Sequence, residues 1–578
     1  MILQALYELY ERKAADPESK IAPEGWEWKE IPFLAVIDNE GNFLRFEDTR
    51  EGEGRKKRAK RFLVPQGEKR TVGIKAFLLW DNIEYALGAN PRKREDIKQR
   101  FTAFQEKLAE VAVVHPDVQA VVKFLNKNPV EQIEKSDSPL WQEMLEGNVF
   151  ITFKVDGSEF ATVCDALPKK ADLSALFGGD TCLITGEKVQ AARLHPAVKG
   201  VRGTNTSGAA IVSFNLPAFC SYEKAQNSNA PVSEKATFAY TTALNVLLGK
   251  DSPNKVGIGD TTIIFWVQKK TRGYNFESDF AWFFKSDKDD PDRNIQAVKG
   301  LYEALYSSKM PLDENNRFYV LGLAPNAARI SVRFWKTGTI REFAEKIRQH
   351  FEDFSIVHGP KDHDHLSLYQ ILTSTVLNYK MDNVPPNLAS AVVVSILDGL
   401  PYPQTLLHQC VRRIRAEQQV TRARTAILKA CINRFNRFYN KSEKEVLMSL
   451  DKSNTNAAYR LGRLFAVLEK IQEEAAPGIN ATIRDRFYGA ASSTPVTVFP
   501  RLLKLKNHHL AKLNPGRKIN FEKEIGEICD ELKDTFPGHL TLDAQARFAV
   551  GYYHQRQDFF KKKSEKNSNL NEAIEEDL

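Results

Sequence analysis

The sequence predicts an α+β N-terminal region with a mixed or antiparallel sheet, followed by an all-α C-terminal helical bundle. Three observations lead to this fold class. Short apolar runs with the two-residue period of β-strands recur through residues 1–340. After Leu388 the strand pattern ends, and apolar residues recur at helical spacing instead. Pro and Gly, as at Pro477-Gly478 and Pro515-Gly516, separate the helical segments.

The N-terminal region alternates helices and strands. Residues 2–13 carry apolar side chains at helical spacing, and the Asp38–Gly41 turn joins two strands into a hairpin. The expected strands are 31–37, 42–47, 149–155, 181–185, 209–215 and 261–268. The expected helices are 2–13, 92–125 with a break at His115-Pro116, 234–248 and 340–351.

The strongest hairpin pattern is RFYVLGLAPNAARISVRFW, residues 317–335. Since side chains of a strand point alternately to opposite faces, its second half has one buried and one outward face. The expected buried residues are Ile330, Val332 and Phe334, and the expected outward residues are Arg329, Arg333 and Trp335. Two guanidinium groups beside an indole suit phosphates and bases, and a solvated strand edge is the alternative.

The C-terminal part is typical of helices joined by Pro/Gly turns. The expected helices are 404–439, as one helix or two, 455–475, 479–490, 498–513, 521–535 and 542–562. At 578 residues the chain exceeds the usual size of one domain. We expect an α+β region at 1–385, with a further division near 130–150 left open, a helical bundle at 386–563 and a disordered tail at 564–578.

Several functional classes find no support in the sequence. No apolar run is long enough to span a bilayer, so we expect a cytoplasmic protein without a membrane partner. The six cysteines form no Cys-x-x-Cys pair, which favours reduced thiols and predicts no metal site. The P-loop, the Gly-x-Ser-x-Gly elbow and the His-Glu-x-x-His motif do not occur. We therefore expect neither a cofactor nor catalytic residues.

Charge is distributed unevenly along the chain. The net charge is only +8, yet residues 401–563 contain 29 Lys and Arg against 16 Asp and Glu. A basic segment of this size is typical of a protein that binds a polyanion, although solvated helices can also be basic. The cations of the bundle that could line a groove are Arg460, Arg463, Lys470, Arg484, Arg486, Arg501, Lys504 and Lys506.

A first candidate nucleic-acid loop follows the N-terminal hairpin. Six cations fall within residues 55–61, and a Pro/Gly turn follows at 64–70. Such a block repels itself, so it is either a flexible solvated loop or a loop that becomes ordered on phosphates. The candidate residues are Arg55, Lys56, Lys57, Arg58, Lys60, Arg61, Gln66, Lys69 and Arg70.

A second candidate loop is the Gly-rich segment 199–208. Its three glycines leave the backbone bare, so a phosphate could approach the N–H groups closely, while Arg202 and Asn205 could reach further. Glycine-rich loops without this role are common, and the residue types alone leave both possibilities open.

Seven stretches, in order over nearly the whole chain, resemble one protein family. They are MILQALYELYER at 1–12, FLLWDNIEYALG at 77–88, KGVRGTNTSGAAIVSFN at 199–215, NAPVSEKATFAYTTALNVLL at 229–248, IGDTTIIFWV at 258–267, VLGLAPNAARISVRFW at 320–335 and YRLGRLFAVLEKIQ at 459–472. The family that they resemble is the large subunit of the type I-C Cascade, a CRISPR surveillance complex; this subunit is the subtype-C form of Cas-eight.

The resemblance implies a non-catalytic binding subunit. It would recognise the protospacer-adjacent motif in duplex DNA, promote unwinding and R-loop formation, stabilise the displaced strand and help recruit a helicase-nuclease. Its partners would be guide RNA, target DNA, the backbone and guide 5′-end subunits, and a small subunit. Residues 1–385 would contact the duplex through the two loops together with Arg329 and Arg333.

The resemblance also implies a role for the helical bundle. The bundle would resemble the Cascade small subunit and would hold the displaced strand with Arg460, Arg463, Arg484, Arg486, Arg501 and Lys504. A separate small subunit can start at an internal methionine in this family, and Met448 is a candidate, with an ordinary helix methionine as the alternative.

The alternative function is a metal-dependent nuclease at Lys361–His365. His363, Asp364 and His365 are suitable ligand types. A His-Asp nuclease core needs further His and Asp residues on other helices, and the eleven histidines of the chain show none in a matching register. A turn that leads into a helix is the other interpretation of this segment.

Overall fold

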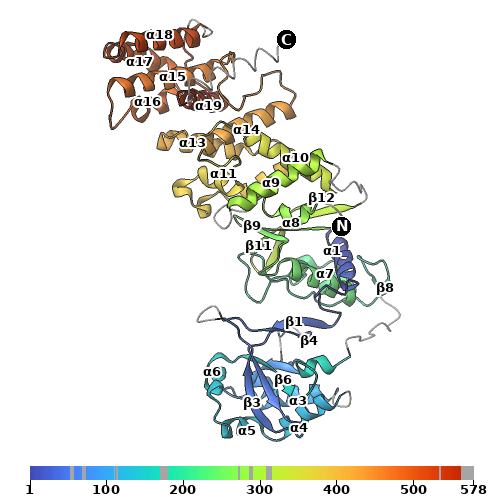
Figure 1. The fold of residues 1–578 in the computed structure, drawn as a ribbon. Helices are drawn as coiled ribbons and strands as arrows, with labels where there is room; N and C mark the ends of the chain where they lie inside the picture. The colour runs from blue at the N-terminus through green and yellow to red at the C-terminus, as the bar shows by residue number, and fades with distance from the viewer. Residues whose placement is uncertain are drawn as a thin grey trace. The chain divides into compact units, whose positions relative to one another are not determined.

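The computed structural model describes residues 1–52, 57–67, 70, 73–109, 111, 115–168, 180–270, 274–284, 291–307, 316–530, 532 and 535–560. The chain divides into two compact units, which are described separately below (Figure 1). The first unit is Met1–Val198 with Ala210–Val246, and the second is Lys199–Ala209 with Leu247–Leu578.

A mixed four-stranded sheet organises the first unit. Its strand order is β3-β2-β6-β5, with β2 parallel to β6 and the other pairs antiparallel. A parallel pair needs a long crossover, and the helices between β5 and β6 lie in it. These elements are β2 (Phe33–Ile37), β3 (Phe43–Asp48), β5 (Trp80–Asn82), α2 (Ile83–Ala86), α3 (Ile97–Ala109), α4 (Pro116–Asn126), α5 (Pro129–Lys135), α6 (Pro139–Gly147) and β6 (Phe150–Val155). Phe153 of β6 packs against Phe104 and Phe124, so α3 and α4 share the buried core of the sheet.

A two-stranded ribbon in the same unit carries the first candidate loop. In it β1 (Trp26–Glu30) pairs antiparallel with β4 (Arg61–Pro65). The indole N–H of Trp80 donates to the carbonyl of Pro65 at 2.8 Å, which ties the ribbon to β5. The remaining elements are α1 (Ile2–Ala14), η2 (Val163–Ala166), β7 (Asp180–Thr181), β8 (Lys188–Val189), η3 (Pro217–Phe219), η4 (Gln226–Asn229) and α7 (Glu234–Leu247). Tyr10 and Phe238 meet edge to face and join α1 to α7.

An antiparallel sheet with the order β12-β11-β10-β9 begins the second unit. Its strands are β9 (Lys255–Ile258), β10 (Thr261–Val267), β11 (Arg317–Asn326) and β12 (Arg329–Thr339), and the helices packed with it are α8 (Phe276–Phe280), α9 (Pro291–Tyr306) and α10 (Ile340–Phe354). One face buries Phe265 and Phe318 against these helices. On the other face Tyr319 stacks on Trp335, and the ring of Trp266 packs against both at a tilt.

Helices complete the second unit, and one hydrophobic core runs from the sheet into them. They are α11 (Leu368–Ser374), η5 (Leu377–Tyr379), η6 (Met381–Asn383), α12 (Leu388–Asp398), α13 (Gln404–Glu417), α14 (Arg422–Phe438), α15 (Ala457–Ala475), α16 (Ile483–Ala491), α17 (Pro495–Leu510), α18 (Pro515–Cys529) and α19 (Leu542–Asp558). The predicted boundary at residue 385 falls inside this unit, so that division of the chain stays a prediction. Among the described residues, no helix has the length and apolar character needed to cross a bilayer.

The predicted fold class is confirmed: strands form mixed and antiparallel sheets in the N-terminal region, and the C-terminal half is mostly helical. Three local predictions are wrong. Residues 209–215 form two bridge residues, two bends and irregular chain rather than a strand, and the strand expected at 181–185 ends at Thr181 and is followed by a turn. Val332 is 40% exposed rather than buried. A β-bulge at Arg333 shifts the register between β11 and β12, and this shift turns Val332 outward. The predicted tail at 564–578 lies outside the described residues.

A stability prediction follows from the crossing of α15 and α19. A Cβ on Gly462 would lie 2.0 Å from the carbonyl oxygen of Phe548, and one on Gly551 would lie 2.1 Å from that of Tyr459. We expect Gly462→Ala and Gly551→Ala each to lower the free energy of unfolding by about 1–3 kcal/mol, because the helices must move apart. Gly526→Ala in α18 is the control, since no atom lies within 4 Å of its Cβ position. Equal thermal melting of all three variants would contradict the close packing.

Candidate nucleic-acid interface

The Gly-rich loop 199–208 packs onto the turn between β9 and β10. The backbone N–H of Arg202 donates to Thr262 Oγ1 at 3.0 Å, and its guanidinium donates to the carbonyl of Gly259 at 2.9 Å. Gly200 has a φ of +89°, and a Cβ there would lie 2.4 Å from the carbonyl oxygen of Leu248. Glycine is therefore required at this point for the loop to approach the rest of the unit.

The hairpin of β11 and β12 reaches the same turn. Arg333 forms an ion pair with Asp260 at 3.2 Å, and Gly203 of the loop approaches Pro325 near the hairpin tip, where a Cβ would lie 3.1 Å from the proline ring. We call Arg202, Arg333 and the Gly259–Asp260 turn the arginine turn. The structure thus brings together two segments that the sequence analysis had selected separately.

The other residues predicted in these two segments lie differently. Asn205 is exposed on the Gly-rich loop, whereas Arg329 is half-buried at the start of β12. Trp335, which was expected beside the arginines, has its ring stacked on Tyr319 at 5.3 Å.

The arginine turn contains one carboxylate, that of Asp260, for two guanidinium groups. A local positive charge therefore remains there.

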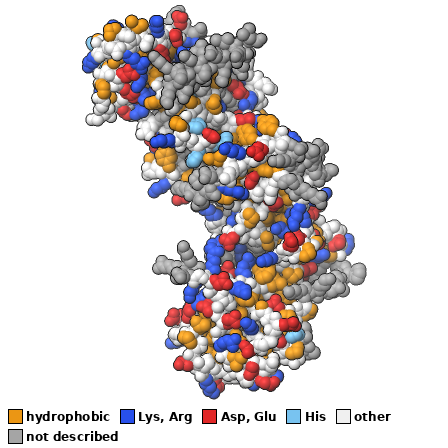
Figure 2. Space-filling view, in the orientation of Figure 1, with side chains coloured by type: hydrophobic (Ala, Val, Ile, Leu, Met, Phe, Trp, Pro, Cys, Tyr) orange, Lys and Arg blue, Asp and Glu red, His pale blue; other side chains and the backbone are white. Residues whose placement is uncertain are grey.

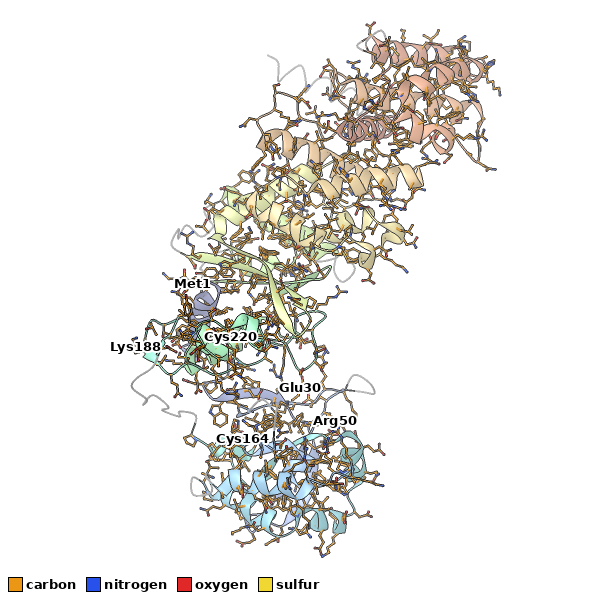
Figure 3. All side chains as sticks on the ribbon, turned by 180° about the vertical axis from the view of Figure 1, so that it is seen from behind. Met1, Glu30, Arg50, Cys164, Lys188 and Cys220 are labelled. Carbon is orange, nitrogen blue, oxygen red and sulfur yellow. The ribbon has the colours of Figure 1, made fainter. Side chains whose placement is uncertain are left out.

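The first candidate loop presents exposed cations. Backbone hydrogen bonds of 2.9 Å in both directions between Glu51 and Arg58 close the loop at its base. The described residues that are exposed are Lys57, Arg58, Lys60, Arg61 and Gln66. Arg55, Lys56 and Lys69 lie outside the described residues. Figure 3 labels Glu30, at the end of β1, and Arg50, which precedes the loop and pairs with Asp48.

Arg70 has a structural environment rather than a surface one. Its guanidinium lies 3.8 Å from the ring centroid of Phe77 and 4.0 Å from that of Tyr85, and it pairs with the buried carboxylate of Asp81. Its Nε donates to the carbonyl of Lys75 at 2.7 Å. Burial raises the pKa of Asp81, and the bond from Arg70 opposes this shift. Because these contacts occupy the guanidinium, we leave Arg70 out of the interface.

The cations selected in the helical bundle fall into two groups. Arg460 is buried and donates to the carbonyls of Asn454 and Glu527, at 2.7 and 3.1 Å. Arg463 is 1% exposed and donates to Gln555, and burial lowers its pKa. These two side chains cannot reach a nucleic acid in this fold.

The second group of bundle cations lies at the surface. Arg486 on α16 and both Arg501 and Lys504 on α17 are exposed, and the guanidinium of Arg501 lies 5.4 Å from the ring centroid of Phe487. Arg484 is half-buried, near Glu469 and Asp485. Figure 2 shows Lys and Arg side chains interspersed with Asp and Glu over the face in view.

The nuclease alternative gains no support from the geometry. His363 and Asp364 are exposed, and the ring of His365 packs edge to face on Phe351 while burial lowers its pKa. His358 lies 3.8 Å from Asp364. Within the described part of the chain, no three His, Cys, Asp or Glu side chains form a group that could hold a metal ion.

Residues 90–94 form an exposed basic loop that is not among the predicted site segments. Its signal in the sequence is the run Pro91-Arg92-Lys93-Arg94, which the helical period assigned from residue 92 onward hides. In the structure α3 begins at Ile97, and the loop precedes it.

A mutation separates the structural role of Arg70 from a binding role. We expect Arg70→Ala to destabilise the first unit by about 3–5 kcal/mol, because it leaves the buried Asp81 carboxylate without its partner. Arg61→Gln, at an exposed position on β4, is the matched control and should melt like the unmodified protein. Thermal unfolding followed by circular dichroism measures both. An unchanged melting curve for Arg70→Ala would return this residue to the candidate surface.

The sequence model of a family described as CRISPR-associated protein (Cas_Csd1) matches residues 6–560. A search of curated proteins gives no match. The matched range contains the Gly-rich loop, the arginine turn and the exposed cations of α16 and α17. The chain therefore belongs to the Cas_Csd1 family of CRISPR-associated proteins.

Proposed function

We propose that this protein is the non-catalytic large subunit of a type I-C CRISPR effector complex. In this role it recognises the protospacer-adjacent motif in duplex DNA, promotes unwinding and R-loop formation, stabilises the displaced strand and helps recruit the helicase-nuclease. Its partners are guide RNA, target DNA and the other Cascade subunits. The observation that carries the proposal is the arginine turn, because it joins two candidate DNA-binding segments that are far apart in the sequence.

The chemistry of the arginine turn suits a duplex. Guanidinium groups bind phosphates in a bidentate manner and also bind the N7 and O6 acceptors of guanine in the major groove. The contacts to Gly259 and Asp260 orient both side chains before DNA arrives. Gly203 packs its Cβ side against Pro325 and is otherwise exposed, so a phosphate can approach the loop from the solvent side. Base pairing with the guide reads the target sequence, so the protein has only a short duplex motif to read.

The helical bundle supports the second half of the proposed role. Exchange of a DNA duplex for an RNA–DNA duplex is close to balanced in free energy, so a few cationic contacts to the displaced strand are enough to favour the open state. Arg486, Arg501 and Lys504 are the exposed residues that we assign to these contacts. Arg460 and Arg463 instead hold α15 to its neighbours.

Met448 remains our candidate start of a separate small subunit. It lies between α14 and α15, and its side chain is 53% exposed. A chain that starts there keeps α15 together with α16, α17, α18 and α19, and α15 packs on each of them. Such a fragment would therefore retain the centre of its own core.

The first test removes the two arginines of the arginine turn. In the double variant Arg202→Gln with Arg333→Gln, we expect weaker binding to the target duplex. The negative slope of log K against log salt should become shallower by about 0.9 for each lost phosphate contact. Arg45→Gln with Lys154→Gln is the control, because it removes the same two charges from the first unit. Arg45 is exposed and pairs with Asp156, and Lys154 is partly exposed and pairs with Glu47. An equal change in the control would mean that net charge alone decides the binding.

The second test addresses the nuclease alternative. Labelled duplex and single-stranded DNA are incubated with the purified protein and Mg²⁺ or Mn²⁺, followed by gel analysis. We expect intact DNA, because the described residues bring no ligand group together near His363. Cleavage that disappears in His363→Ala and persists in His508→Ala, an exposed histidine on α17, would refute the binding role as the whole function.

A further inference from the structure

The loop Asn90–Arg94 of the first unit, which we call the Arg92 loop, is an exposed cationic segment that the proposed interface does not use. It lies between α2 and α3. Three consecutive cations occupy it, and the side chains of Arg92, Lys93 and Arg94 are all exposed. Over residues 84–100 there are five Lys and Arg against three Asp and Glu, so the loop keeps an excess of positive charge after its neighbours are counted.

The Arg92 loop is held in shape by its own hydrogen bonds. The side-chain oxygen of Asn90 accepts the N–H of Arg94 at 2.7 Å, and the side-chain nitrogen of Asn90 donates to the carbonyl of Arg94 at 3.0 Å. Lys93 adopts a left-handed backbone, with a φ of +50°, between these anchor points. A ligand that binds here does not have to order the backbone of the loop, which lowers the entropic cost of binding.

One buried carboxylate orients the guanidinium groups without neutralising them. Glu84 is 1% exposed and lies 3.9 Å from Arg92, 3.3 Å from Arg94 and 3.3 Å from Arg100. Arg100 also pairs with Asp96 at 2.8 Å, and its side chain is largely buried. The three guanidinium groups therefore face two carboxylates, Glu84 and Asp96, so one positive charge remains, and Arg92 and Arg94 stay exposed to solvent.

We propose that the Arg92 loop binds the phosphodiester backbone of a nucleic acid. This inference rests on the proposed function, because that function brings the protein to DNA and to guide RNA. Paired guanidinium groups beside an ammonium group on an ordered loop match a run of phosphates, which arginine binds in a bidentate manner and lysine binds as a point charge. The contrast with Arg70 supports the assignment, since its donors are occupied by Asp81 and the carbonyl of Lys75.

The test uses the full-length protein with Arg92→Gln and Lys93→Asn. Arg94 and Arg100 stay in place to neutralise Glu84, and asparagine tolerates the left-handed backbone at position 93. Binding to a DNA duplex and to single-stranded RNA is measured over a range of salt concentrations. We expect the negative slope of log K against log salt to become shallower by about 1.8 for a duplex ligand, or by about 1.4 for a single-stranded one. Lys123→Gln with Lys135→Gln is the control, which removes the same charge from α4 and α5.

The measurements with duplex DNA and with single-stranded RNA together identify the ligand. A smaller slope with DNA only assigns the Arg92 loop to the target duplex, and a smaller slope with RNA only assigns it to the guide. Unchanged slopes with both, or an equal fall in the control, overturn the inference but leave the proposed function intact. If the unmodified protein binds neither ligand, the proposed function fails as well. Lys93→Asn alone, which leaves every contact of Glu84 in place, should give half the effect even if the double variant melts early.

Discussion

The turn between β9 and β10 is the constraint on which the proposed interface depends. Gly259 offers its carbonyl to Arg202, Asp260 offers its carboxylate to Arg333, and Thr262 accepts the backbone N–H of Arg202. These contacts fasten a Gly-rich loop to a hairpin that lies far away in the sequence. Because they form within the protein itself, the two guanidinium groups are positioned before any ligand arrives. With one carboxylate for two arginines, the turn keeps a positive charge for a polyanion.

Arginine serves two purposes in this chain, and the surroundings of each side chain decide which. The guanidinium groups of Arg70, Arg460 and Arg463 donate to buried carboxylate, amide and carbonyl oxygens. These bonds hold helices, loops and strands together. Arg202 and Arg501 keep part of their guanidinium exposed. The basic excess of residues 401–563 is therefore larger than the positive charge that the bundle exposes at its surface.

The pattern of apolar residues located most elements. Burial on one face imposes a period of 3.6 on α10, whereas β10 is a continuous apolar run because it is buried on both faces. The period could not show that Val332 turns outward, since a bulge belongs to a pair of strands and not to one of them. The segment 209–215 has the composition of a strand, yet a strand also needs a neighbour, which its own residues do not reveal. The candidate site was located to its segments, but the sequence could not show that Arg202 and Arg333 meet at one turn. It also could not show that Arg460 is buried, because one of its partners is the carbonyl of Glu527, which lies in α18 and is 67 residues away in the sequence.

The central claim is that this protein contributes the reading of a duplex motif to a guide-loaded complex. The most direct measurement is the affinity of the assembled complex for a series of duplexes that share one guide-matched target and differ only in the flanking base pairs. We expect the affinity to fall about tenfold or more when the preferred flank is replaced, because each lost bidentate contact to a base costs about 1–3 kcal/mol. Equal affinity for every flank would contradict the account.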